Sequence, residues 1–525
     1  MLETKRIVNW LWIIPGIVAF FIALIPTIAN QWPLTLDIYT HIHLAQVYSH
    51  YGLTLIDPTT NPPAGTPIAY PPLFSLILMA LAVIFKSDYF TISRALQPVL
   101  AFLAVSSISY VAKKFYGDIA GISAGFLILS SYLFSRMVSP LPETLAIVFV
   151  PLAIYFYYKS IISKKYLYAI VSSLLFLLVI LTHQATTLIL FLTVTAITVV
   201  AGFMKREKFY LYAYPLFLSL PILIGIIASL VALVLAPNYV TKIFAYGVTA
   251  VTGYTSSLPI SDPISDGKYL VYLGIVLIFA IIGAVVAVKR RKTRDIFILV
   301  WIVVVFFMSK SYWFGVNVYT IRLLVHLLIP LSILGGLGLS YLYLDYKKTE
   351  FPNIKVRTLF LAVILIVSAL FAVTTVSDPQ LNMLPKYNAQ PYNQSDLIIP
   401  QITPPTNSEV ELANWFKQNG DNKSAVVSNN YATNIFVQAE TNQPIAGVQS
   451  SEHVIEWGFN ADELKQKEIG YLIFDKRLNY TSNSTEKIIS QGTFIFYNTN
   501  YNITALLPEN SQLLYQNQNF DVFKI

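Results

Sequence analysis

Long runs of apolar residues alternate with short polar segments along the first 377 positions and predict a bundle of membrane-spanning helices. A helix needs ~20 residues to cross a hydrocarbon core of ~30 Å, and most of the runs approach that length. A further run, Leu73–Phe85, has only 13 residues and predicts a short re-entrant or interfacial segment. The pattern predicts eleven spans, at 8–28, 94–112, 117–135, 144–158, 166–182, 185–203, 210–235, 269–288, 296–310, 323–343 and 358–377.

The pattern changes after residue 377. Residues 378–408 are rich in Pro, Asn and Gln, which is typical of an extended linker. Residues 409–525 then predict a small α/β or α+β domain. Its expected elements are a helix at 409–418 and strands near 424–428, 470–474, 493–497, 513–517 and 520–524. The expected fold is therefore a polytopic α-helical membrane domain at 1–377 followed by a soluble domain.

Composition agrees with a membrane protein. Charged residues make up 12% of the chain, about half of the ~25% found in soluble domains. The net charge is +8, but Lys and Arg lie in short segments between apolar runs, which indicates membrane topology and not a nucleic-acid partner. The chain has no cysteine. Disulfides, thiolate metal sites and cysteine nucleophiles are therefore excluded.

The positive charges predict the orientation. With a cytoplasmic N-terminus and no crossing by Leu73–Phe85, the cytoplasmic loops hold 19 Lys and Arg and the short outer loops hold 7. The positive-inside rule favours this arrangement, with the C-terminal domain outside the plasma membrane of a prokaryotic cell. The glycosylation sequons agree, because all of them follow residue 377, at Asn393, Asn422, Asn479, Asn483 and Asn502.

Two acids lie on the predicted outer face. Asp37 belongs to the first outer loop, 29–72, at the start of a predicted amphipathic helix. Its carboxylate either caps that helix or serves as an acid or metal ligand at the membrane surface. Glu143 lies at the mouth of a span, where an unpaired carboxylate is costly. It is either a functional acid or the partner of nearby Arg136.

A histidine and an arginine are predicted to reach the same face. His183 ends a span and is either a hydrogen-bonded interface residue or a ligand. Arg322 opens the tenth span, where it contacts either a lipid phosphate or ordinary headgroups. No cytoplasmic loop is long enough for a catalytic domain or contains a phosphate-binding glycine motif. Chemistry is therefore expected outside, on substrates delivered through the bilayer.

This layout resembles the GT-C membrane glycosyltransferases, and most closely the oligosaccharyltransferase catalytic subunit. That family has an Asp followed by an aromatic residue and a His in its first outer loop, here Asp37, Tyr39 and His41. A second acidic motif follows two spans later, here Ser139–Glu143. An Arg at the start of a late span, which meets the carrier phosphate in the family, corresponds to Arg322.

The resemblance implies transfer of a sugar from a polyprenyl (dolichyl-type) phosphate carrier to a protein or glycan acceptor on the outer face. It implies that Asp37 and Glu143 are catalytic and hold a divalent cation, Mg²⁺ or Mn²⁺. The implied substrate-binding residues are Tyr39, His41, Arg136, His183, Arg322 and Tyr431.

The C-terminal domain departs from the family. Where oligosaccharyltransferases carry Trp-Trp-Asp-Tyr-Gly to recognise the acceptor sequon, this chain has Ser428-Asn429-Asn430-Tyr431-Ala432, and only the Tyr is shared. Recognition of a sequon in the same way is therefore not expected. Two alternatives stay open, a transporter or flippase of lipid-linked sugars and an inactive GT-C-like scaffold. The almost uncharged spans argue against the transporter.

Overall fold

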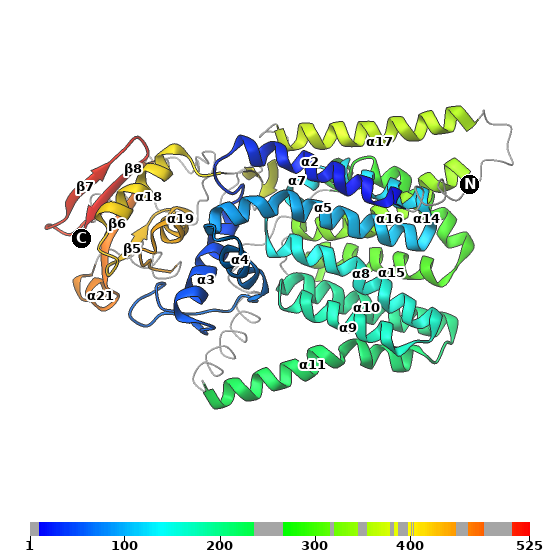
Figure 1. The fold of residues 1–525 in the computed structure, drawn as a ribbon, viewed down its shortest axis with the longest axis horizontal. Coiled ribbons are helices and arrows are strands. Elements are labelled where there is room, and N and C mark those ends of the chain that lie inside the picture. The colour runs from blue at the N-terminus through cyan, green and yellow to red at the C-terminus, as the bar shows by residue number, and fades with distance from the viewer. Residues whose placement is uncertain are drawn as a thin grey trace.

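Long helices form one end of the molecule, and a small sheet with its own helices forms the other (Figure 1). The computed structural model describes residues 10–235, 266–314, 320–344, 354–377, 383–386, 397–400, 402, 404–447, 460–476 and 507–525. Outside these residues lie the strand expected near 493–497, most of the expected linker, and the sequons at Asn393, Asn479, Asn483 and Asn502.

The helical end is a multi-pass membrane bundle. Among the described residues, seven helices are long and apolar enough to cross a membrane, or eight if α13 and α14, bent by 95°, form one broken span. The helices of this end are η1 (Leu11–Ile13), α2 (Ile14–Ala29), α5 (Tyr89–Tyr116), α6 (Asp118–Leu129), α7 (Phe134–Met137), α8 (Pro142–Ser163), α9 (Tyr166–Ile180), α10 (Gln184–Lys205), α11 (Tyr210–Leu235), α13 (Asp266–Leu273), α14 (Val276–Arg290), α15 (Thr293–Ser309), η2 (Ser311–Phe314), α16 (Thr320–Leu344) and α17 (Ile354–Ser377).

The expected number of eleven spans is not confirmed. Three of the expected spans coincide with α6, α9 and α15, which have 12, 15 and 17 residues. A helix of 12 residues rises only ~18 Å, well short of a ~30 Å hydrocarbon core. Hydropathy located these three helices correctly but overestimated the length of α6 and α9, because the apolar runs continue into the turns that follow them.

Helix α16 forms the centre of the bundle, and glycines bring its neighbours close. A Cβ on Gly336 would overlap the carbonyl oxygen of Ala120 in α6, and one on Gly338 would overlap that of Phe279 in α14. On the facing helix, a Cβ on Gly283 would overlap the carbonyl oxygen of Leu334. Small residues of this kind let helix backbones pack closely in a membrane. They fix the position of α16 and of the side chains at its first turns.

Helices α3 (Asp37–Tyr51) and α4 (Leu73–Phe85) lie between the bundle and the C-terminal sheet (Figure 1). The helix expected near Asp37 is α3, whose apolar side chains pack with those of α4 and of α19 in the C-terminal region. Helix α4 has the 13 residues of the short apolar run and is shorter than a span. The hairpin β1 (Ile56–Asp57) and β2 (Thr66–Pro67) connects α3 to α4.

The C-terminal region contains a four-stranded sheet in the order β5-β6-β8-β7. The β5–β6 pair is parallel and the other pairs are antiparallel, which makes this region α/β. Four strands and one helix lie close to their expected positions, whereas α19 and α21 were not predicted, and β3 and β4 lie within the expected linker. The elements are β3 (Met383–Lys386), β4 (Leu397–Pro400), α18 (Asn407–Asn419), β5 (Ala425–Ser428), α19 (Tyr431–Thr441), α21 (Ala461–Gln466), β6 (Ile469–Asp475), β7 (Gln512–Gln516) and β8 (Phe520–Lys524).

The first loop continues the edge of this sheet. Thr60 forms a parallel bridge with Ile445, and Ile445 forms one with Val426 of β5. The backbone N–H of Asn61 also donates to the carbonyl of Ile445 at 2.8 Å, and the Asn61 side chain accepts from Gly447 N–H at 2.7 Å. The loop before the bundle and the C-terminal sheet are thus hydrogen-bonded into one structure.

Candidate active site

Charged side chains from four separate segments meet where α3 contacts the bundle. Arg136 lies on the single-turn helix α7, and Glu143 is in the first turn of α8, where the helix dipole favours a carboxylate. The Nε atom of Arg136 donates to Oε2 of Glu143 at 2.9 Å, and its Nη2 lies 3.8 Å from Oδ2 of Asp37. The pairing of Glu143 with Arg136, one of the two alternatives from the sequence, is therefore present.

Asp37 lies between two guanidinium groups. The Nη2 atom of Arg322, from the start of α16, is 3.6 Å from the same Oδ2 atom that faces Arg136. These separations exceed ordinary hydrogen-bond lengths. The side chain of Asp37 is 43% exposed and that of Arg322 is 41% exposed, so both are accessible to a substrate.

Two histidines extend the cluster into the bundle. His183 caps the N-terminus of α10, and its Nδ1 lies 2.7 Å from the hydroxyl of Thr186. That hydroxyl lies 3.2 Å from Nε2 of His326, which is 3.6 Å from Oε1 of Glu143. His326 was not singled out from the sequence. Its position in the sequence does indicate the site, because a residue four positions after Arg322 lies on the same face of α16 as Arg322.

An aromatic pair closes the cluster on the side of the first loop. The rings of His41 and Tyr70 meet edge to face with centroids 4.7 Å apart, and Tyr70 lies 6.4 Å from His183. Burial lowers the pKa of His41 to about 4, against the opposing effect of the Asp37 carboxylate. His41 is therefore neutral near pH 7. Burial raises the pKa of the Tyr70 hydroxyl above its ordinary value. Tyr70 was also not predicted as a site residue.

The two remaining predicted residues lie away from these charges. Tyr39 is fully buried against Phe436 of α19, with ring centroids 5.1 Å apart, and its hydroxyl donates to the carbonyl of Pro33 at 3.2 Å. The structure does not bring it into the cluster. Tyr431, at the start of α19, lines a cavity of about 180 Å³ together with Tyr70 and Gln438.

A buried polar network holds the first loop beside that cavity. Oδ2 of Asp57 lies 3.0 Å from Nε2 of His43, and Asp57 accepts hydrogen bonds from the hydroxyls of Thr59 and Thr60 at 2.7 and 2.6 Å. Burial alone would raise the pKa of Asp57, but these partners lower it to about 2. The side chain of Gln438 in α19 donates to the Thr60 hydroxyl at 3.0 Å. The network joins the loop to α19.

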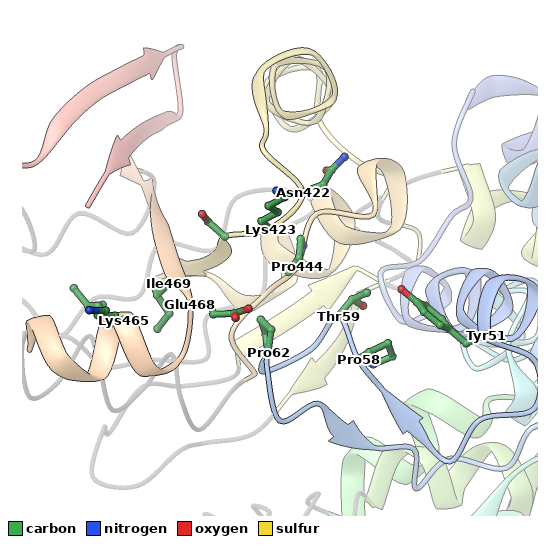
Figure 2. Close-up of a pocket in the computed structure, with 12 residues that line it drawn as sticks. Tyr51, Pro58, Thr59, Pro62, Asn422, Lys423, Pro444, Lys465, Glu468 and Ile469 are labelled. Atoms are coloured by element: carbon green, nitrogen blue, oxygen red, sulfur yellow. The ribbon is translucent and has the colours of Figure 1, made fainter.

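A larger cavity of about 600 Å³ lies on the C-terminal side of the same loop (Figure 2). Its wall includes Tyr51 from the end of α3, Lys423 beside the sequon residue Asn422, and Lys465 and Glu468 near the start of β6. None of the charged residues of the cluster lines it. The smaller cavity is bounded by Tyr70, whose ring meets that of His41 in the cluster.

The cluster does not match the expected metal site. A divalent cation requires several oxygen or nitrogen ligands, and the described residues contain no group of three His, Asp or Glu side chains that could hold one. The guanidinium of Arg136 instead contacts both carboxylates expected to bind the cation. Asp37, Arg136, Glu143, His183 and Arg322 are brought together, but with an arginine between the two acids.

Comparison with known proteins places this arrangement in context. Residues 34–259 match the family model described as oligosaccharyl transferase STT3, N-terminal. No curated protein sequence matches the chain significantly. The fold is similar to that of ArnT from Cupriavidus metallidurans bound to undecaprenyl phosphate, with a TM-score of 0.63 and 12% identity over 98% of this chain and 97% of that chain.

The oligosaccharyltransferase AglB from Archaeoglobus fulgidus, in complex with an inhibitory peptide and a dolichol-phosphate, has a TM-score of 0.61 and 12% identity over 91% of this chain and 70% of that chain. Its structure with Zn and sulfate has a TM-score of 0.59 and 12% identity over 88% of this chain and 68% of that chain. The shared fold confirms the expected GT-C architecture.

Proposed function

We propose that the protein is an inverting membrane glycosyltransferase that moves a sugar from a polyprenyl phosphate carrier to an acceptor on the outer membrane face. One observation carries the proposal: Asp37, exposed and flanked by Arg136 and Arg322, lies at the end of a GT-C bundle that contacts the C-terminal region. A carboxylate beside two guanidiniums offers a base next to a site for a phosphate. The positive-inside bias of the loops supports the outer orientation of this end.

The carrier phosphate would bind at Arg322. A guanidinium binds phosphate through two parallel hydrogen bonds, and this one is partly exposed and held only 3.6 Å from an exchangeable carboxylate partner. When the phosphate arrives, Arg322 turns from Asp37 to the phosphate oxygens. The exchange frees the carboxylate of Asp37 to accept a proton. His183 lies nearby and would support the same anion through a hydrogen bond.

An apolar cavity supports a path for the carrier chain. It has a volume of about 430 Å³ and is lined by Phe306 of α15, by Leu273, and by Leu327 and Leu331 of α16. Leu327 follows Arg322 by five residues, which is ~7.5 Å along a helix axis. A carrier whose phosphate contacts Arg322 could therefore lay its first isoprene units against this apolar surface within the bilayer.

The acceptor would enter from the side of the first loop and α19. The cavity is lined by Tyr70 and Tyr431, and the ring of Tyr70 meets that of His41 edge to face. The acceptor nucleophile attacks the anomeric carbon of the sugar as the bond to the carrier phosphate oxygen breaks. Its proton passes to Asp37, and the phosphate leaves as an anion facing Arg322. Tyr431 would contact the acceptor.

A deletion strain tests the function. The strain is complemented with wild-type protein or with the Asp37→Ala variant, and lipid-linked and protein-linked glycans are compared by mass spectrometry. Loss of a defined sugar in the deletion, restored only by the wild type, is the expected result. Restoration by both proteins would remove Asp37 from the mechanism. Movement of an intact lipid-linked sugar without covalent transfer would instead indicate a transporter.

A further inference from the structure

We infer that the guanidinium of Arg136 takes the place of a divalent cation between Asp37 and Glu143, so that sugar transfer requires no bound metal. The inference rests on the proposed function, because it concerns the charge that faces the same leaving phosphate. It differs from what the resemblance to oligosaccharyltransferases implies, namely a cation held by these two acids.

The geometry places Arg136 on the atoms that a cation would need. It hydrogen-bonds Oε2 of Glu143 at 2.9 Å and lies 3.8 Å from Oδ2 of Asp37. A Mg²⁺ ion would have to approach the same oxygens to about 2.1 Å. The side chain of Arg136 is 11% exposed and that of Glu143 is 4% exposed. The buried guanidinium therefore fills the space between the carboxylates.

Among the described residues, the carboxylates and guanidiniums of the cluster are equal in number. Two carboxylates, Asp37 and Glu143, face two guanidiniums, Arg136 and Arg322. Neutral His41 adds no charge near pH 7. A divalent cation would therefore meet no net negative charge and would be repelled by arginines that cannot lose their protons. A phosphate, by contrast, meets two guanidiniums directed towards one exposed carboxylate.

Two histidines lie close to Glu143 and Thr186, while Oε1 of Glu143 has no hydrogen-bond partner among the residues that the structure describes. Nε2 of His326 lies 3.6 Å from Glu143 and 3.2 Å from Thr186, while Nδ1 of His183 lies 2.7 Å from the Thr186 hydroxyl. A cation bound to both oxygens of Glu143 would have to displace the guanidinium of Arg136 from Oε2. Arg136 is thus a positioning residue: it holds Glu143, orients Asp37 and adds fixed positive charge behind the leaving phosphate.

Metal binding by purified full-length protein in lipid nanodiscs tests this inference without a substrate. Mn²⁺ is titrated by electron paramagnetic resonance into the wild type, Arg136→Gln and Arg136→Lys. We expect no stoichiometric site in the wild type or in the Lys variant, which keeps the charge. The Gln variant should bind Mn²⁺ at least about tenfold more tightly, because a nearby positive charge has been removed. Adding Asp37→Asn to the Gln variant should abolish that gain.

One result that needs no variant of Arg136 would overturn the inference: a single Mn²⁺ bound per wild-type protein that is lost in Asp37→Asn. This holds even if a variant of Arg136 fails to fold.

An activity measurement separates the inference from the function on which it rests. Membranes that contain the wild-type protein and the native lipid-linked sugars are treated with EDTA, and transferred glycans are measured by mass spectrometry. Undiminished transfer supports the inference. Transfer that stops in EDTA and returns with Mg²⁺ or Mn²⁺ preserves the glycosyltransferase but refutes the role given to Arg136. The absence of transfer under both conditions refutes the proposed function itself.

Discussion

The Nε atom of Arg136 donates a hydrogen bond to Oε2 of Glu143 at 2.9 Å, and both side chains are withdrawn from solvent. Each charge offsets the desolvation cost of the other, so removing one side chain leaves an isolated buried charge. Glu143→Leu should therefore destabilise the protein by about 3 kcal/mol, measured by thermal unfolding in nanodiscs.

The double variant Arg136→Leu/Glu143→Leu should lose less stability than the sum of the two single variants. The exposed pair Lys164–Glu207, at 3.3 Å, is a matched control. Glu207→Gln should cost no more than about 1 kcal/mol. Equal losses at Glu143 and Glu207 would contradict the buried character of the Arg136 pair.

Asp37→Asn should reduce transfer at least about 100-fold, because an amide of the same shape cannot accept the acceptor's proton. Membrane expression should not change, since the side chain is partly exposed. Asp118→Asn is the control, because Asp118 is also a first-turn acid paired with a cation, Lys113, but lies outside the cluster. Glycan mass spectrometry of complemented strains measures both. Comparable transfer by both variants would exclude Asp37 as the base.

Acidification should lower the free energy of unfolding, because the unfolded chain binds a proton at His41 more readily than the folded protein does. Its pKa is about 4 when folded, below the ordinary value of ~6.5 for an unfolded chain. The unfolded state therefore binds more protons between these values, and stability is full above pH 6.5 and falls as the pH drops towards 4. At pH 5.5 the loss should be roughly 1 kcal/mol. His41→Gln should lack this component, so the melting temperatures of the two proteins should converge on acidification. Parallel pH profiles would contradict the assignment.

Close packing of α14 against α16 predicts that replacing Gly283 by alanine costs stability, whereas the same change at Gly225 in α11 does not. Gly283→Ala should cost about 1–3 kcal/mol, because its new methyl group meets the backbone carbonyl of Leu334. Gly225→Ala in α11 should be neutral or stabilising, since no atom lies within 4 Å of the added carbon. Thermal unfolding in detergent compares the two. Similar melting temperatures would show that α14 and α16 can separate without cost.

Local patterns predicted much of this architecture. Apolar runs located the helices of the bundle, and alternating strands located β5, β6, β7 and β8. Charged and polar residues beside apolar runs predict Asp37, Glu143, His183 and Arg322 as candidates, and the structure brings these side chains together. Charges near the hydrocarbon core are conspicuous in a sequence because leaving them unpaired is costly.

The remaining features depend on contacts between distant segments. Nothing near Tyr70 in the sequence reveals that its ring meets His41, and nothing near His326 reveals Glu143, 183 residues earlier. The expected metal site was based on the two acids alone. Whether such acids bind a cation or an arginine depends on where the short helix α7 places Arg136, which only the folded bundle determines.

The bridges from Thr60 to Ile445 and from Ile445 to Val426 have a consequence for how the chain can be divided. A fragment beginning near residue 404 would keep Ile445 on β5 but would expose the edge of Ile445 that Thr60 covers and the face of α19 that packs on α3. Uncovered strand edges beside apolar surface associate with one another. The C-terminal region is therefore an integral part of the fold, and excising it would yield a fragment prone to aggregation.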